Sequence, residues 1–209
     1  MKKLLSLVLA LLLALSFAGC SGSTAMTEAN VTDTVDRAFD ALQNFDTKKL
    51  EKYVDSKTLS VIISYANKHD QFADLGKALF KNLEYSIESI DLDAKTVTVS
   101  VRNKDLKDTA SEFTKALVSK YSALQMLGLL NNETWLNTSL KSLTDSIAIA
   151  KMQSAPVSVT LTVTAGKKNL MLGFDDAAEN AVSGGALQAV KSLTSGLTGS
   201  KSTTESTSN

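Results

Sequence analysis

The chain has 209 residues and carries 22 Lys and Arg against 22 Asp and Glu, so its formal net charge at neutral pH is zero. Proteins that bind nucleic acid need clustered Lys and Arg to displace counterions, and this balance argues against that class, so we expect no nucleic-acid partner. The length suits one domain of ordinary size.

The N-terminus has the three parts of a secretory signal peptide. Lys2 and Lys3 supply positive charge, the apolar run 4–15 follows, and small residues precede Cys20, the only cysteine. The apolar run is too short for a membrane span, which takes about 20 apolar residues. We therefore predict that residues 1–19 are a signal peptide that is removed.

The segment 15–20, Leu-Ser-Phe-Ala-Gly-Cys, resembles the lipobox of bacterial lipoproteins, although Phe17 stands where that family usually has Leu. In those proteins the cysteine thiol receives a diacylglyceryl group, and the signal peptide is cut just before it. The resemblance implies that Cys20 is the lipid-attachment residue, that residues 20–26 form a short tether, and that membrane lipid holds the protein on the extracytoplasmic side of the cell membrane. Each buried methylene contributes ~0.8 kcal/mol, so a diacyl group anchors a protein stably without a basic patch.

Apolar residues recur at intervals of three and four from residue 27 onward, which is the spacing of amphipathic helices. A first helix is predicted to end near Phe45, and a second runs from Asp46 to Val54. A third follows Ser56 and continues beyond the polar break 67–70. Each helix has a polar opposite face, so each is expected to pack on one side only.

Two pairs of segments then show the two-residue alternation of half-buried strands. The first pair is 83–92 and 97–101, and a shift of its apolar phase predicts a bulge near Ser89. The second pair is 157–163 and 170–174. Both pairs are predicted to form hairpins, with valines facing inward and Ser and Thr facing outward.

Between the hairpins the helical spacing returns, and it predicts an inserted helical pair over residues 105–152. After the second hairpin, Asp176 and Glu179 have the spacing of a capping box that opens a short last helix. The C-terminal residues 191–209 are mostly Ser, Thr and Gly with almost nothing to bury, so we predict a disordered tail there.

This order of elements predicts a single α+β domain over residues 27–190, with N-terminal helices packed on a curved antiparallel sheet of about four strands. The three leading helices, the segment 39–54 and the strands that end at 170–174 resemble small surface lipoproteins of Gram-positive bacteria. Their domain is similar to the cone of nuclear transport factor 2-like (cystatin-like) proteins, several of which have no known function. The resemblance implies a cavity between sheet and helices, which enzymes of that fold use as an active site.

The inward strand positions are valines and leucines, so a cavity lined by them would be apolar or filled. Tyr53, Tyr65 and Tyr85 are the candidate ligand-binding residues, because their hydroxyls could orient a small apolar ligand at the cavity mouth. The alternative is that they are core residues whose hydroxyls reach water. Trp135 is the candidate partner-binding residue, because Trp is enriched at interface hot spots, or else it covers a neighbouring helix.

His69 is the only histidine, and its place in the polar break 67–70 predicts a surface position. One histidine and one acylated thiol leave no Ser-His-Asp or Cys-His set for nucleophilic catalysis. They also leave too few ligands for a transition-metal site. We therefore expect no catalytic set, no cofactor and no metal.

Three functions stay open. The favoured one is a membrane-tethered envelope lipoprotein that is not an enzyme and binds a small apolar ligand or another envelope component. The second is a hydrolase or isomerase with a carboxylate in the cone, helped by Tyr85. The third is an accessory subunit that docks through the helical insertion, which would expose an apolar patch on Phe113, Leu117, Tyr121 and Trp135.

The substitution Cys20→Ala is expected to move the mature protein from the membrane fraction to the soluble fraction, because the acyl chains need the thiol. Cell fractionation and mass spectrometry of the N-terminus measure this. The neighbouring Ser21→Ala keeps the thiol and should stay in the membrane fraction. Equal retention of both variants, or an unmodified thiol in the natural chain, would contradict lipid anchoring.

Overall fold

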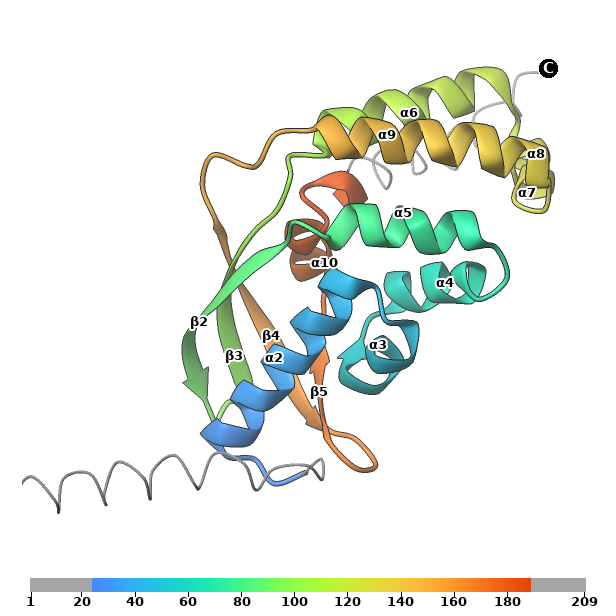
Figure 1. The fold of residues 1–209 in the computed structure, drawn as a ribbon. Coiled ribbons are helices and arrows are strands. Elements are labelled where there is room, and N and C mark those ends of the chain that lie inside the picture. The colour runs from blue at the N-terminus through green and yellow to red at the C-terminus, as the bar shows by residue number, and fades with distance from the viewer. Residues whose placement is uncertain (1–23, 189–209) are drawn as a thin grey trace, which may run out of the picture.

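Helices cover one face of an open sheet, and a further helical layer extends beyond them (Figure 1). The computed structural model describes residues 24–188. The predicted signal peptide 1–19, Cys20 and the predicted tail 191–209 therefore lie outside the described residues. In chain order the elements are α2 (Glu28–Asn44), α3 (Thr47–Tyr53), β1 (Val54–Asp55), α4 (Lys57–Ala66), α5 (Asp70–Phe80), β2 (Glu84–Asp91), β3 (Thr96–Arg102), α6 (Lys107–Lys120), α7 (Ala123–Leu129), α8 (Glu133–Trp135), the π-helical turn η2 (Leu136–Leu140), α9 (Lys141–Ile149), β4 (Val157–Ala165), β5 (Leu170–Gly173) and α10 (Asp176–Val182).

The sheet has the strand order β1-β5-β4-β3-β2, and every neighbouring pair is antiparallel except β1, which runs parallel to β5. The predicted α+β class and both predicted hairpins are confirmed. The predicted count of about four strands missed β1, because Val54 does not lie on a helix but pairs with Leu172. Two residues are too few to show the alternation by which a strand is recognised. The sheet is consequently mixed.

Strand β2 contains the irregularity predicted near Ser89. Ile87 faces Val99 in β3, and the pairing then shifts before Ser89, so Glu88 is an extra residue in the ladder. The bulge keeps the apolar side chains on the inward face of the strand, so that Ile87 and Ile90 both pack against the core. The hairpin therefore keeps one apolar face along its whole length.

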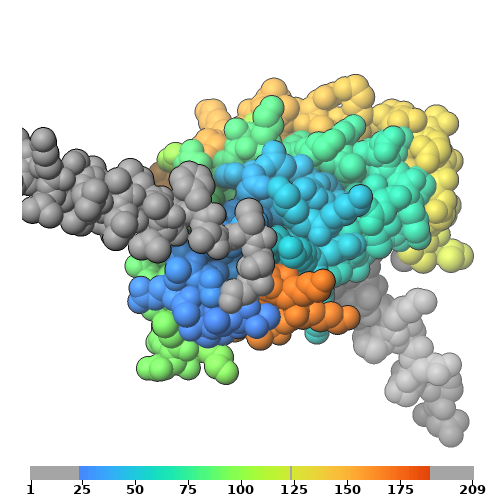
Figure 2. All heavy atoms as spheres, turned by 60° about the horizontal axis from the view of Figure 1, so that its bottom comes forward, coloured from blue at the N-terminus to red at the C-terminus, as the bar shows by residue number. Residues whose placement is uncertain are grey.

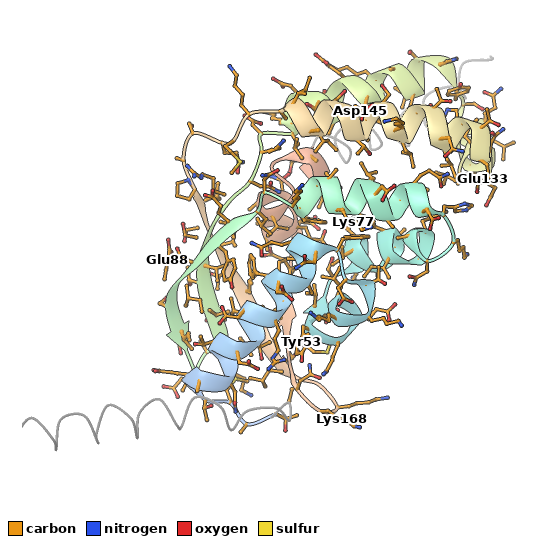
Figure 3. The ribbon with its side chains drawn as sticks, in the orientation of Figure 1. Tyr53, Lys77, Glu88, Glu133, Asp145 and Lys168 are labelled. Carbon is orange, nitrogen blue, oxygen red and sulfur yellow. The ribbon has the colours of Figure 1, made fainter. Side chains whose placement is uncertain are left out.

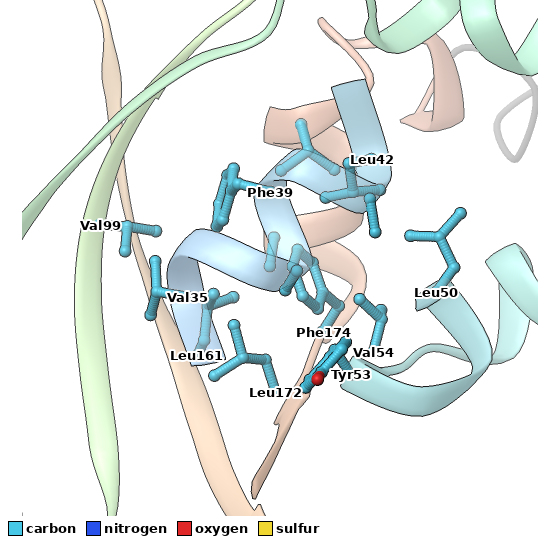
Figure 4. Close-up of a cluster of buried hydrophobic side chains, with 14 of the residues drawn as sticks. Val35, Phe39, Leu42, Leu50, Tyr53, Val54, Val99, Leu161, Leu172 and Phe174 are labelled. Carbon is cyan, nitrogen blue, oxygen red and sulfur yellow. The ribbon is translucent and has the colours of Figure 1, made fainter. Parts of the chain in front are cut away.

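Helix α2 packs its apolar face on the sheet (Figure 4). The hydroxyl of Thr27 caps the N-terminus of the helix by accepting the N–H of Asn30 at 3.3 Å. The predicted apolar spacing of this helix coincides with its buried face. The core between α2 and the sheet contains Val31, Val35, Phe39, Leu42, Val99, Leu161 and Leu172.

Phe45 joins the end of α2 to α5. Its backbone is left-handed, with a φ of 48°, and its ring stacks on Phe80 with the centroids 6.2 Å apart. The same ring lies so close to Gly76 that an added Cβ would overlap it. Gly76 is thus required by the close approach of α5 to α2, while its own backbone is that of an ordinary helix.

The predicted third helix is in fact two helices. The polar break ends α4 at Ala66, and α5 begins at Asp70. The two helices lie side by side, and α5 occupies the position between α4 and the inserted helices (Figure 1). The Ser56 hydroxyl caps α4 by accepting the N–H of Leu59 at 3.0 Å.

The predicted insertion 105–152 forms the outer helical layer (Figure 1). Helix α6 is one arm, and α8, η2 and α9 run on as the other arm, which packs on α5. Lys104 and Met152 pair as an isolated β-bridge at the base of the two arms. The insertion has buried apolar residues outside the main core cluster: Leu106, Ala110, Leu136, Leu140 and Ile147.

The root of the insertion is closed by Asn103, which is fully buried. Its backbone N–H donates to Oε1 of Gln153 at 3.1 Å, and its backbone oxygen accepts the N–H of Gln153 at 2.9 Å. Its side-chain Nδ2 donates to the carbonyls of Leu79 at 2.8 Å and Val182 at 2.7 Å. Asn103 therefore links the end of β3, the end of α5 and the end of α10.

Helix α10 closes the described chain against the sheet. The predicted capping box is wrong, because the side chain that accepts the N–H of Ala178, at 2.8 Å, belongs to Asp175 and not to Asp176. Glu179 does not return to the cap either, and its carboxylate accepts a hydrogen bond from Ser56. This carboxylate is part of the candidate site described below.

Gly184 follows α10 in a left-handed conformation, with a φ of 62°. Its carbonyl accepts the N–H of Leu106 at 2.8 Å, and an added Cβ would overlap the backbone carbonyl of Lys104. The turn after α10 is therefore packed tightly against the base of α6, where only glycine fits.

Gly184→Ala is expected to lower the free energy of unfolding by about 2 kcal/mol or more. A left-handed backbone costs a residue with a Cβ about 1–2 kcal/mol, and the overlap with Lys104 adds to this. Urea denaturation measures the change. Gly128→Ala is the control, because a Cβ added to that helical glycine would meet nothing within 4 Å. The control should be neutral or slightly stabilising, and equal stability of the two variants would contradict the tight packing.

Candidate functional site

A cavity of about 290 Å³ lies among α2, α4, α5 and α10. Its volume is near the lower end of small-molecule pockets, which run from about 300 Å³ upward. Each helix contributes residues from its buried or half-buried face, so the walls are almost wholly apolar. The apolar lining includes Leu42, Leu59, Ile62, Leu79, Phe174 and Val182.

One corner of the cavity is polar and is formed by Ser56, Thr58 and Glu179. The Glu179 side chain comes from α10, and only 8% of the residue is exposed. Its Oε1 accepts a hydrogen bond from the Ser56 hydroxyl and another from the backbone N–H of Thr58 at 3.3 Å. This oxygen thus lies at the N-terminus of α4, where the helix dipole favours a negative group.

The other carboxylate oxygen of Glu179 has no partner. Within residues 24–188, Oε2 is buried and receives no hydrogen bond. The ion pairs formed in this part of the chain do not include Glu179. Buried polar groups are nearly always hydrogen-bonded, so this oxygen calls for an explanation.

The three candidate tyrosines lie away from this cavity. Tyr53 is buried with Lys52 above its ring, and the Nζ atom lies 4.9 Å from the centroid. The ring of Tyr65 packs against Phe72 with the centroids 5.2 Å apart. None of the three, Tyr85 included, lines the cavity. The structure does not bring their hydroxyls together.

Tyr85 packs on the core and points its hydroxyl toward α2. Its ring stacks on Phe39 at a centroid distance of 4.3 Å, and the hydroxyl donates to Oδ1 of Asp36 at 2.8 Å. Partial burial, together with the hydrogen bond to Asp36, raises the pKa of Tyr85 to about 12. This carboxylate–tyrosine pair is at the edge of the core, and its carboxylate is exposed.

Trp135 is half-buried in α8, and the other residues of the expected apolar patch, Phe113, Leu117 and Tyr121, are half-buried too. The exposed leucines lie on α7 instead, with 80% of Leu124 and 63% of Leu127 accessible. The chain turns between α6 and α7, so these leucines do not continue the face of α6 that carries Phe113 and Leu117.

His69 lies in the polar break between α4 and α5, as predicted, and its half-buried side chain, 13% exposed, connects this break with the insertion. Nδ1 of His69 lies 2.8 Å from Oε1 of Glu133, and Nε2 of Gln71 donates to the other oxygen at 3.0 Å. These hydrogen bonds lower the pKa of Glu133. Figure 3 shows Glu133 at the α8 end of the molecule, whereas Tyr53 lies by α3.

A second depression lies between α2 and α3. Figure 2 shows the face on which these two segments lie, coloured blue and light blue. The charged side chains of the depression pair with one another: Arg37 lies 2.7 Å from Asp33, and Lys49 lies 2.9 Å from Asp40. These pairs are largely exposed, so we do not favour this depression as a ligand site. Within the described part of the chain, no three His, Cys, Asp or Glu side chains are grouped to hold a metal ion.

Comparison of the chain with protein-family models, with curated proteins and with solved structures finds no match. The resemblance to small surface lipoproteins therefore stays a prediction. Among residues 24–188, no helix combines the length and the apolar character that a membrane crossing needs.

The apolar residues around Glu179 in the sequence indicate that its side chain is buried, which the capping-box interpretation did not consider. Glu179 lies between Ala178 and Ala181–Val182, and all of these residues are buried. A carboxylate side chain that lies on the same face of a helix as apolar residues is expected to be buried with them. Asn103 gave no such signal, because it follows a strand where polar residues are common.

Alkaline titration can test the raised pKa of Tyr85, which lies at the edge of the core. Its raised pKa means that its contribution to stability is complete below about pH 10, the unfolded value, and is lost as the pH rises through about 12. Tyrosinate absorbance should show one tyrosine that ionises last, and Tyr85→Phe should remove this step. Asp36→Asn should shift this step to lower pH, because the negative charge that disfavours the tyrosinate is removed. A last step unchanged in Tyr85→Phe would contradict the assignment.

Proposed function

We propose that the protein is a lipid-anchored, extracytoplasmic binding protein that holds a small apolar ligand in the cavity between α4, α5 and α10. The single observation that carries this proposal is the cavity of about 290 Å³ with almost wholly apolar walls. The cavity is partly open to solvent, so a ligand can enter it, and a mostly apolar lining with a few polar groups is typical of small-molecule sites.

The placement of the chemically active side chains favours binding over catalysis. The carboxylate at the cavity is held by Ser56 and Thr58, while His69 pairs with Glu133 in the insertion. The tyrosine–carboxylate pair that the enzyme alternative requires is that of Tyr85 with exposed Asp36, which is not at the cavity. No observation favours the enzyme alternative.

The lipid anchor at Cys20 would keep this binding site close to the membrane surface. The described chain begins at Thr24, a few residues after the proposed attachment point, and α2 starts at Glu28. A tether of this length extends by only about 3.3–3.6 Å per residue, so the domain would stay near the bilayer. Apolar molecules that leave a membrane would meet the cavity there.

Ile62→Phe is expected to weaken the binding of the apolar fluorophore N-phenyl-1-naphthylamine by about tenfold or more, because Ile62 lines the cavity and the larger ring occupies it. Val61→Phe is the matched control: it lies next to Ile62 on α4, and 57% of Val61 is exposed. Fluorescence titration in the Cys20→Ala background, where no acyl chain competes, measures both. Absence of fluorophore binding, or equal loss in both variants, would contradict the proposal.

A further inference from the structure

At the polar corner of the cavity, Oε2 of Glu179 receives no hydrogen bond. The Ser56 hydroxyl has one proton, and it is donated to Oε1 of Glu179. The backbone N–H of Thr58 is directed to the same oxygen. The nearby Ser183 hydroxyl, also at the cavity, donates to the carbonyl of Asn180 at 3.1 Å. These three donors are thus committed, and the Thr58 hydroxyl, which also belongs to this corner, forms no hydrogen bond with Oε2 either.

The corner also carries a negative charge without a matching cation. No Lys or Arg of residues 24–188 forms an ion pair with Glu179, although 92% of the residue is removed from solvent and its carboxylate accepts two hydrogen bonds on one oxygen only. Buried charges in proteins are normally paired, since an isolated charge in an apolar setting is costly.

We infer that the cavity is specific for amphiphiles with a single primary ammonium head, toward which the buried carboxylate of Glu179 turns its unpartnered Oε2 while the apolar walls take the hydrocarbon chain. This inference rests on the proposed ligand-binding function and adds the class of ligand. An ammonium group supplies three donors and a positive charge, and so provides both things that the corner lacks.

The same corner discriminates against other head groups. A hydroxyl head supplies one donor but leaves the charge of Glu179 unpaired. A carboxylate or phosphate head places a like charge beside Glu179 in apolar surroundings, where repulsion is strong. The expected order of affinity is therefore primary amine, then alcohol, then carboxylate, for chains of equal length.

The test displaces N-phenyl-1-naphthylamine from the Cys20→Ala chain with octylamine, octanol and octanoate at neutral pH, where octylamine is charged. Octylamine should displace the fluorophore at a concentration about tenfold lower than octanol, in line with a charge-assisted hydrogen bond. Octanoate should be the weakest. Octyltrimethylammonium, which has the charge but no N–H donor, should bind more weakly than octylamine.

Glu179→Gln should weaken octylamine binding by about tenfold and affect octanol binding much less, because the amide oxygen still accepts a hydrogen bond but carries no charge. Glu51→Gln, which neutralises an exposed carboxylate on α3, is the matched control and should keep the full preference. If Glu179→Gln does not fold, the head-group series on the unsubstituted side chain decides alone.

The outcomes separate the two proposals. Equal affinity for the three head groups, a preference for octanoate, or an unchanged amine preference in folded Glu179→Gln would overturn the ammonium inference and leave the cavity as an apolar binding site. Failure of the fluorophore and of all the ligands to bind would overturn the binding function itself. Tight amine binding that is lost in Glu179→Gln and kept in Glu51→Gln would support both.

Discussion

The buried side chain of Asn103 is the constraint on which the arrangement of the helical layers depends. Both N–H groups of its amide donate to main-chain carbonyls, and Oδ1 accepts the N–H of Lys104 at 2.7 Å. Leaving such a group without partners in a protein interior costs about 1–3 kcal/mol. The carbonyls belong to Leu79 and Val182, which both line the cavity. One amide therefore links the base of the insertion to two residues of the cavity wall.

At Glu179 the stability of the fold and the proposed ligand binding make opposite demands on one side chain. An apolar side chain of similar volume in its place would continue the buried face of α10 and fill the core without an unpaired charge. The hydrogen bonds that Oε1 accepts at the start of α4 offset part of the free-energy cost of burying the carboxylate. Oε2 accepts no hydrogen bond in the described chain, so it offsets none of this cost. A locally unfavourable group next to an apolar cavity is the pattern expected of a binding site rather than of a core.

The sequence predicts the elements of this fold well, because hydrophobic spacing reports directly on which face of a segment is buried. The apolar positions of α2, the two hairpins and even the bulge at Glu88 follow from this rule. The two-residue strand β1 is beyond its reach, since Val54 continues the apolar spacing of α3 before it joins the sheet. The split between α4 and α5 was visible as a polar break but was interpreted as an interruption within one helix.

The candidate site is harder to predict, because its residues come from segments far apart in the chain. Spacing shows that Leu59 and Val182 are buried, but it does not show that they face the same space. The tyrosines were chosen for hydroxyls that could serve a ligand, and Tyr85 instead found a partner in Asp36 on the neighbouring helix. The local spacing of Glu179 predicts a helix cap, whereas its actual partner, Ser56, is 123 residues away in the sequence.

The way in which the insertion joins the sheet affects how much variation the chain can tolerate. Strands β3 and β4 pair in register from Thr96 to Val101, although the whole insertion separates them in sequence. The entropy of closing a flexible loop grows only with the logarithm of its length, by about 0.6 kcal/mol for each doubling. The two arms could therefore gain or lose helical turns in the course of evolution while the valines of β3 keep their places. A single residue added within β3 would instead turn those valines outward and abolish the core.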